Sequence, residues 1–144
     1  MSGIIGGIGS KSGVIGNTEL VESGCLVQWS GTGSDTGLFD MPFNNIIYDI
    51  AGEYNTSTNL FTARYSGKYL VIVQMGWDGL NDGLQIQAYI KVEGTTVSFG
   101  RIGTGMADHQ TAYTSKVVEV KATDTIGAAA YTTHNRNWLA DTDC

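Results

Sequence analysis

Oxygen-bearing side chains gather in the glycine-rich stretch GWDGLNDG at residues 76–83, which holds Asp78, Asn81 and Asp82. Carboxylate and amide oxygens are the ligands that Ca²⁺ takes in proteins. Their spacing does not match the twelve-residue loop of an EF-hand. The sequence therefore favours a solvated turn here and leaves calcium binding as an open alternative.

Other patterns that could carry chemistry fail on spacing. Lys11 and Ser12 follow a glycine-rich run, but a phosphate-binding loop needs Gly directly before Lys, where Ser10 stands. The two histidines, His109 and His134, do not form a ligand-spaced cluster. The chain has no nucleophile elbow, no Cys–His pair in a catalytic context and no zinc motif. We therefore predict no catalytic residues, no metal site and no cofactor, and a protein that is not an enzyme.

The two cysteines, Cys25 and Cys144, lie far apart in the sequence. Residues 1–16 lack the basic start and unbroken apolar run of a signal peptide, and no stretch approaches the 18 apolar residues of a membrane span. In a chain without an export signal, two cysteines are more often free thiols than a disulfide. Free thiols are expected, and a Cys25–Cys144 bridge stays open.

The net charge excludes some classes of binding partner. The net charge is −6, with only eight Lys and Arg among 144 residues. No basic surface is available to neutralise phosphates, so nucleic acid is an unexpected partner. An acidic chain is also repelled by anionic membranes. Neither nucleic acid nor a membrane is therefore an expected partner.

The chain favours short strands throughout. Twenty glycines and a single proline suit tight turns between strands. We expect eight to ten antiparallel strands and no helix, with loops at 31–37, 76–83 and 103–110. The expected strands cover residues 25–30, 43–50, 60–65, 68–75, 84–93, 95–102, 111–120 and 125–133, with a further short one near 138–140. This spacing is typical of a β-sandwich or jelly roll.

The centre of this pattern is Tyr54 to Tyr69, which reads as strand, turn, strand, turn, strand. The turn residues 55–59 include Asn59, a residue that tolerates positive φ. The run KYLVIVQM at 68–75 follows, and its continuous apolar character predicts a strand buried on both faces.

An N-terminal arm precedes this head. Residues 1–16 are rich in glycine and carry five apolar side chains: Ile4, Ile5, Ile8, Val14 and Ile15. Burying them would stabilise by about 1.5–3 kcal/mol each, whereas ordering each residue costs about 1–2 kcal/mol. We therefore expect the arm to order only against a partner, for example by strand addition. The predicted division is an arm and connector at 1–24 and a head at 25–144.

Residues 43–69 resemble the core of the complement C1q/TNF superfamily. The matching positions are Phe43, Tyr54, Asn55, Thr58, Phe61, Thr62, Ala63, Gly67 and Tyr69. Asn59 stands where the family usually has Gly, and Arg64 where it usually has Pro. The family's closing strand, Phe-x-Gly followed by aliphatic residues, is absent, and residues 137–140 are a degenerate substitute.

This resemblance implies an all-β, C1q/TNF-like antiparallel jelly-roll sandwich that forms a homotrimer and works as a binding head. Aromatic side chains dominate buried interface energetics. Tyr48, Tyr69 and Tyr89 are accordingly the predicted trimer-interface residues.

The arm resembles a segment found in structural proteins of tailed bacteriophages, where it can precede a C1q-like domain. The combination predicts a virion protein, assembled in the host cytoplasm: a trimeric capsid decoration (cement) protein whose arm binds the major capsid protein or another virion protein. The alternative is a receptor-binding knob or tail-fibre protein that contacts a host surface glycan or protein. A secreted cytokine-like or lectin-like ligand is a third reading, against which the missing signal peptide counts.

Overall fold

The computed structural model describes residues 22–31, 33–80, 83–103 and 108–138, and these contain ten strands and no helix. No helix in these ranges is long and apolar enough to cross a membrane. The strands are β1 (Cys25–Gln28), β2 (Ser34–Asp40), β3 (Asn45–Asp49), β4 (Tyr54–Asn55), β5 (Leu60–Thr62), β6 (Gly67–Leu80), β7 (Gln85–Val92), β8 (Thr95–Gly103), β9 (Asp108–Val120) and β10 (Thr125–Asn137).

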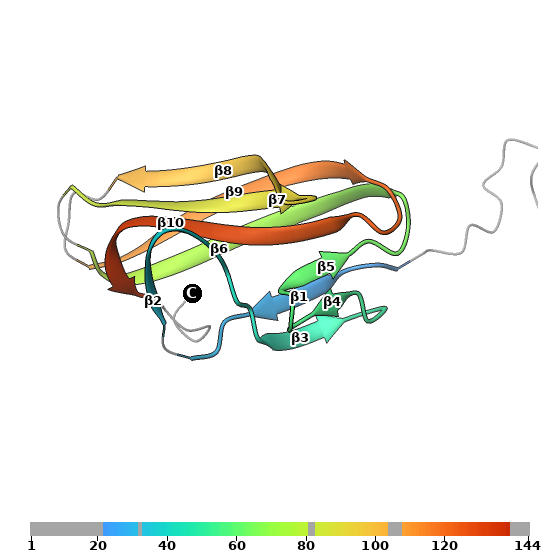
Figure 1. The fold of residues 1–144 in the computed structure, drawn as a ribbon, viewed down its shortest axis with the longest axis horizontal. Coiled ribbons are helices and arrows are strands. Elements are labelled where there is room, and N and C mark those ends of the chain that lie inside the picture. Colours follow the sequence, from blue (N-terminus) through green and yellow to red (C-terminus); the bar gives the residue numbers. More distant parts are fainter. Residues whose placement is uncertain (1–21, 32, 81–82, 104–107, 139–144) are drawn as a thin grey trace, which may run out of the picture.

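All strand pairs are antiparallel, and they form one large sheet and two smaller ones. The large sheet runs β4-β5-β10-β7-β8, with β2 also paired to β10. The long strands β6 and β9 pair with each other, and β1 pairs with β3. In Figure 1 the β6–β9 pair extends alongside β7, β8 and β10, while β1 and β3 lie beyond β6. The prediction of an all-β antiparallel fold is confirmed.

The core lies between the large sheet and the β6–β9 pair. Strand β7 alternates as predicted, burying Ile86, Ala88 and Ile90, because successive side chains of a strand point to opposite faces. Their partners come from β6, β9 and β10 and include Met75, Trp77, Ala112 and Ala130. A second cluster near the other end joins Phe61, Ala63, Val118, Val120 and Ile126.

All three predicted loops are wrong in part, and in the expected loop at 103–110 the last three residues already belong to β9 (Asp108–Val120). Residues 34–40 form β2, because their backbone pairs with β10 despite a polar, glycine-containing sequence. Strand β6 continues past Met75 to Leu80, because Gly76 and Trp77 pair with Thr111 and Gln110 of β9. Strand β10 likewise extends to Asn137, beyond the predicted end at residue 133. In each case a neighbouring strand, rather than local propensity, supplies the backbone hydrogen bonds.

The central turn behaves as its residues predict. Asn59 adopts a φ of 57°, the left-handed conformation expected for the Asn that replaces Gly. Its backbone N–H donates to the carbonyl oxygen of Asn55 at 2.7 Å, and the side-chain oxygen of Asn55 accepts from the N–H of Ser57. This turn leads from β4 into β5.

A buried carboxylate fastens the connector to the head. Glu53 is only 7% exposed and accepts hydrogen bonds from the Ser23 hydroxyl at 2.7 Å and from the backbone N–H groups of Gly24 and Arg64. These bonds satisfy a charge that would be costly to bury alone. The chain therefore enters β1 from a fixed point.

Candidate interaction surface

The outward face of the β6–β9 pair carries a stripe of exposed apolar side chains. Its members are Leu70 (67% exposed), Ile72 (57%), Tyr113 (53%) and Val117 (58%), and we call them the β6–β9 stripe. Leu70 and Val117 are directly paired across the two strands. The alternate residues of both strands face the core, so the stripe follows from the period of two.

The stripe corrects one expectation. Residues 68–75 were predicted to form a strand buried on both faces, but in the single chain only one face is covered. The run is continuously apolar because both faces of this part of β6 carry apolar side chains. One face packs in the core, and no described residue covers the other. Exposed apolar groups of this kind mark contact surfaces in soluble proteins.

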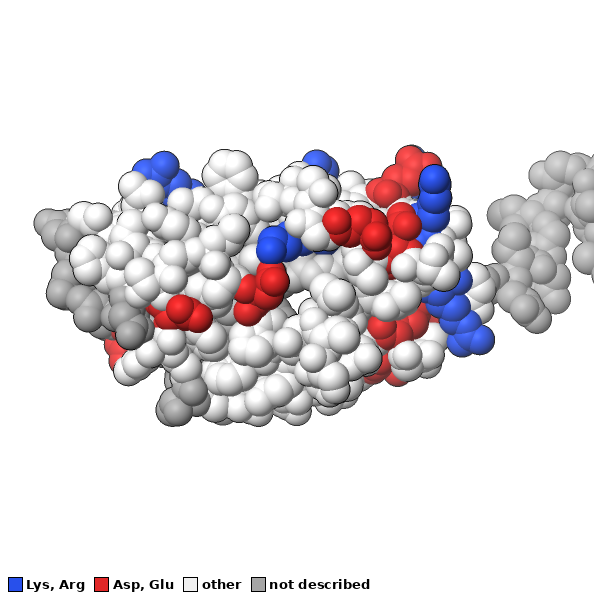
Figure 2. All heavy atoms as spheres, viewed as in Figure 1, with Lys and Arg blue, Asp and Glu red and all other residues white. Residues whose placement is uncertain are grey.

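Further exposed apolar side chains lie on β1 and β3. They are Leu26, Ile46, Ile47 and Tyr48, with Ile50 directly after β3. Charged groups are sparse on the face seen in Figure 2, and several gather near the end where the described chain begins. Charge depletion together with exposed apolar groups is typical of the centre of a protein interface.

The three predicted interface tyrosines do not share one surface. Tyr48 is exposed on β3. Tyr69 packs edge-on against Phe61, and its hydroxyl donates to the carbonyl oxygen of Tyr65. Tyr89 lies on β7 in the large sheet, where its ring stacks with that of Phe99. The interface assignment stays a prediction. Sequence reasoning missed the stripe residues, because a continuous apolar run such as 68–75 does not distinguish a core face from an exposed face.

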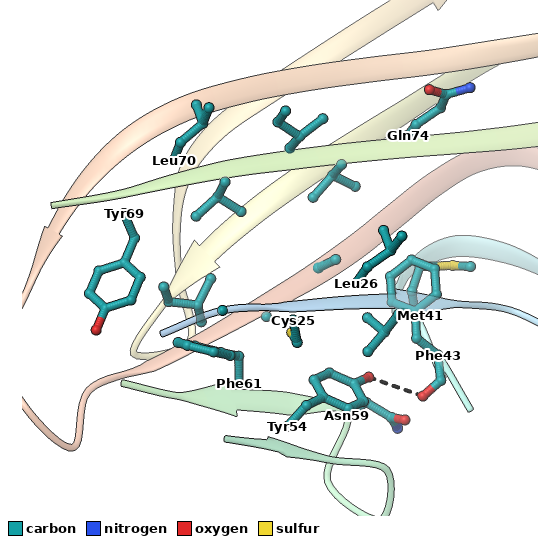
Figure 3. Close-up of a pocket in the computed structure, with 18 of the residues that line it drawn as sticks. Cys25, Leu26, Met41, Phe43, Tyr54, Asn59, Phe61, Tyr69, Leu70 and Gln74 are labelled. Atoms are coloured by element: carbon teal, nitrogen blue, oxygen red, sulfur yellow. Dashed lines mark hydrogen bonds between the residues drawn. The ribbon is translucent and has the colours of Figure 1, made fainter. Parts of the chain in front are cut away.

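A groove of about 890 Å³ lies between β1 and β6. Figure 3 shows residues of β6 on one side, Leu26 and Cys25 of β1 on the other, and Phe61 and Tyr54 nearby. The tyrosine hydroxyl of Tyr54 donates to the carbonyl oxygen of Phe43 at 3.0 Å. Trp29, Trp77 and Trp138 also line the groove. The lining is therefore largely apolar.

The Cys25 thiol lies in this groove, where its surroundings disfavour the negatively charged thiolate. Burial, with smaller contributions from the carboxylates of Asp49 and Glu53, raises the pKa of Cys25 from 9.0 to about 11. Burial also raises the pKa of Tyr54 to about 12, with Cys25 adding to the effect. Cys25 is therefore protonated and unreactive at neutral pH.

The raised pKa of Cys25 predicts slow alkylation. In a Cys144→Ser variant, where Cys25 is the only thiol, the rate with iodoacetamide should rise about tenfold per pH unit and level off only near pH 11. The same variant unfolded in urea should level off by about pH 9, near the ordinary thiol pKa. Mass spectrometry of quenched samples measures both rates, and a plateau at pH 9 in the folded protein contradicts the assignment.

The remaining predicted positions are only partly within the described residues. The arm residues Ile4, Ile5, Ile8, Val14 and Ile15 lie outside them, as do Asn81 and Asp82, while Asp78 is exposed on β6. His134 is exposed, and its carbonyl oxygen accepts from the Thr132 hydroxyl. Within the described ranges no group of three or more His, Cys, Asp or Glu is arranged to hold a metal ion.

Comparison with known proteins gives the fold. No family model matches the sequence, and no curated protein matches it. Among solved structures, the globular domain of zebrafish complement 1qA protein is similar at a TM-score of 0.66 and 12% identity, covering 83% of this chain and 98% of that one. The Eiger TNF of S. frugiperda follows at 0.53 and 17%, covering 76% and 82%. Murine APRIL is similar at 0.50 and 9%, covering 81% and 94%.

These likenesses show a C1q/TNF-like jelly roll, as the resemblance of residues 43–69 implied. At identities this low they establish the fold alone, because one fold hosts many functions. What the chain does must be argued from its own surface.

Proposed function

We propose that this chain is a non-enzymatic virion protein of a tailed phage, in which three copies form a head that decorates the capsid through their N-terminal arms. The carrying observation for assembly is the β6–β9 stripe. Each of its four side chains is 53–67% exposed, so covering what remains exposed would contribute about 1–2 kcal/mol apiece. Three-fold symmetry is what the resemblance to the C1q/TNF superfamily implies.

The arm supports attachment rather than folding. Its five apolar side chains cannot offset the cost of ordering a glycine-rich segment alone, so a second surface is needed. The phage assignment rests on the resemblance of residues 3–20 to phage structural proteins. Three arms on one assembly would also act together, because binding of the first raises the effective concentration of the others.

The connector between the arm and the head is anchored to the head. Ser23 and Gly24 are held to the head by the buried carboxylate of Glu53, so the arm starts from a rigid base.

Deleting residues 1–16 should leave a folded assembly that no longer binds capsids. The expected results are an unchanged circular dichroism spectrum and a loss of cosedimentation with undecorated particles. A matched control restores the arm with Ile4, Ile5 and Ile8 replaced by Ser, which keeps its length but removes much of its apolar surface. Undiminished decoration by either variant would overturn attachment through the arm.

The number of copies per particle separates the proposal from its alternative. A decoration protein should occupy roughly hundreds of equivalent positions on a symmetric shell. A receptor-binding knob would be present in about a dozen copies or fewer, and soluble protein would block adsorption to the host. Copy number from an image of the intact particle decides between them.

A further inference from the structure

The outward face of the large sheet is hollowed at one point along β10. Among the described strands, β5 pairs with β10 up to Gly127 and β2 pairs with it from Ala129 onward, so Ala128 lies between the two partners. A cavity of about 190 Å³ opens there. Lys91 on its wall has the opposite parity to the buried Ile90, so the cavity lies on the side of the sheet that faces away from the core.

Small residues of β10 form the floor of this hollow. Gly127 pairs with Lys91 of β7 on one side and with Leu60 of β5 on the other. A Cβ at Gly127 would lie 2.8 Å from a methyl carbon of Leu60, so the Leu60 side chain leans over this glycine. Ala129 pairs with Asp40 of β2 and is 0% exposed, although it belongs to the outward face. The hollow therefore arises because larger side chains on three strands surround small ones on β10.

Polar residues of several kinds line the hollow. They include Asp40, Lys91, Thr58, Asn59 and Thr125, which carry a carboxylate, an ammonium, an amide and two hydroxyls. Asp40 and Lys91 form a salt bridge with each other, and their side chains are 70% and 20% exposed. A polar hollow is filled either by water or by a ligand that offers the same hydrogen bonds.

Hydroxyl groups fit this lining better than other groups. Each hydroxyl both donates and accepts, so neighbouring hydroxyls of one ring can bond a carboxylate and an ammonium that lie side by side. An apolar protein side chain placed there would leave both charged groups without replacements for the water they lose.

The charges around the hollow favour a neutral ligand. The Asp40–Lys91 pair has no net charge. A further carboxylate, that of Glu93, accepts hydrogen bonds from the backbone N–H and the hydroxyl of Thr125, which lines the hollow. This extra negative charge disfavours an anionic ligand. A neutral sugar ring is therefore the ligand that the lining fits.

An aromatic surface continues the site along the same face. Tyr89 lies on the outward side of β7, where its ring stacks with that of Phe99 at a centroid distance of 5.8 Å, and its hydroxyl donates to the side-chain oxygen of Gln87. Burial raises the pKa of Tyr89, with Tyr131 adding to the effect and the Arg101 guanidinium opposing it, so these groups lie close together. The negative face of an aromatic ring attracts the weakly positive C–H groups of a sugar, while the polar groups at its edge bond hydroxyls.

We propose that the outward face of the large sheet binds a polysaccharide of neutral hexopyranose units, with one ring in the hollow beside the Asp40–Lys91 salt bridge and a neighbouring ring on Tyr89. The β6–β9 stripe lies across the core from this face, so an assembly formed through the stripe leaves the site open. The inference does not depend on the proposed function.

The first test is calorimetric titration of the full chain with three neutral hexasaccharides: maltohexaose, mannohexaose and galactohexaose. They share the pyranose ring and differ in hydroxyl orientation. At least one should bind with a Kd of about 1 mM or lower. The acidic hexagalacturonate should bind at least roughly tenfold more weakly, because Asp40 and Glu93 repel its carboxylates.

The second test uses variants on the hexasaccharide that binds. Asp40→Ala should weaken binding by roughly tenfold or more, because it removes charge-assisted hydrogen bonds. The matched control is Asp35→Ala, which removes an exposed carboxylate from the same strand outside the hollow and should leave the affinity within about twofold. Tyr89→Leu keeps an apolar side chain but removes the flat ring, and should weaken binding by roughly fivefold. Melting temperatures establish that each variant is folded.

Four outcomes would overturn the proposal. One is the absence of binding by all three neutral hexasaccharides. Another is an equal affinity of Asp40→Ala and Asp35→Ala. A third is tighter binding of hexagalacturonate, which would make the face an anion site. The last is protection of this face from hydrogen exchange by a protein partner and by none of the saccharides, which would make it a protein interface.

Discussion

Replacing Leu70 by Glu should convert the proposed trimer into single chains. Leu70 is 67% exposed in the β6–β9 stripe, directly opposite Val117. Burying a carboxylate where a leucine side chain was covered both removes the apolar contribution and adds a desolvation cost. With one copy in each of three contacts, the dissociation constant should rise by roughly four orders of magnitude. Light scattering coupled to gel filtration measures the mass directly.

The matched control is Phe99→Glu. Phe99 is also exposed, at 59%, but lies on β8, where it stacks with Tyr89. If the stripe is the contact, Phe99→Glu keeps the mass of three chains while Leu70→Glu loses it. The opposite result would support the interface predicted at Tyr89 and reject the stripe. A single-chain mass for the unaltered protein would reject the trimer.

Gly100→Ala should severely destabilise the head. A Cβ at Gly100 would lie 1.7 Å from the carbonyl oxygen of Tyr113, which is backbone of β9 and cannot turn away. Nearby, the hydroxyls of Ser98 and Thr114 are 2.9 Å apart, and the Lys116 ammonium donates to the carbonyl oxygen of Val97. These bonds hold β8 against β9, so the strands must separate to admit the methyl group. We expect a loss of about 3 kcal/mol or more in the free energy of unfolding.

Gly103→Ala is the control for this prediction. Gly103 ends the same strand, and a Cβ there would meet nothing within 4 Å. Its backbone conformation also suits an L-residue, so alanine should be neutral or stabilise by up to about 1 kcal/mol. Urea denaturation of the two variants gives the difference. Equal stabilities would show that β8 and β9 do not approach as closely as described.

Two stretches show which strands can be predicted from the sequence pattern and which cannot. Leu84 to Val92 was read correctly because its alternation is complete and one face is core. Ser34 to Asp40 was missed because its residues favour loops and only the neighbouring β10 makes it a strand. The extension of β6 through Gly76 has the same origin in its pairing with β9.

The sequence by itself determined the all-β class, most strand positions and the left-handed turn at Asn59, because period, turn chemistry and glycine content act over short distances. It also carried the resemblance to the C1q/TNF superfamily, which the fold supports. Only the tertiary structure decided which apolar residues remain outside the core. Leu70 and Val73 look alike in the sequence, but one faces water and the other the large sheet. The groove beside β6 was likewise hidden in the sequence, because it depends on where the distant strands β1 and β6 lie in the fold.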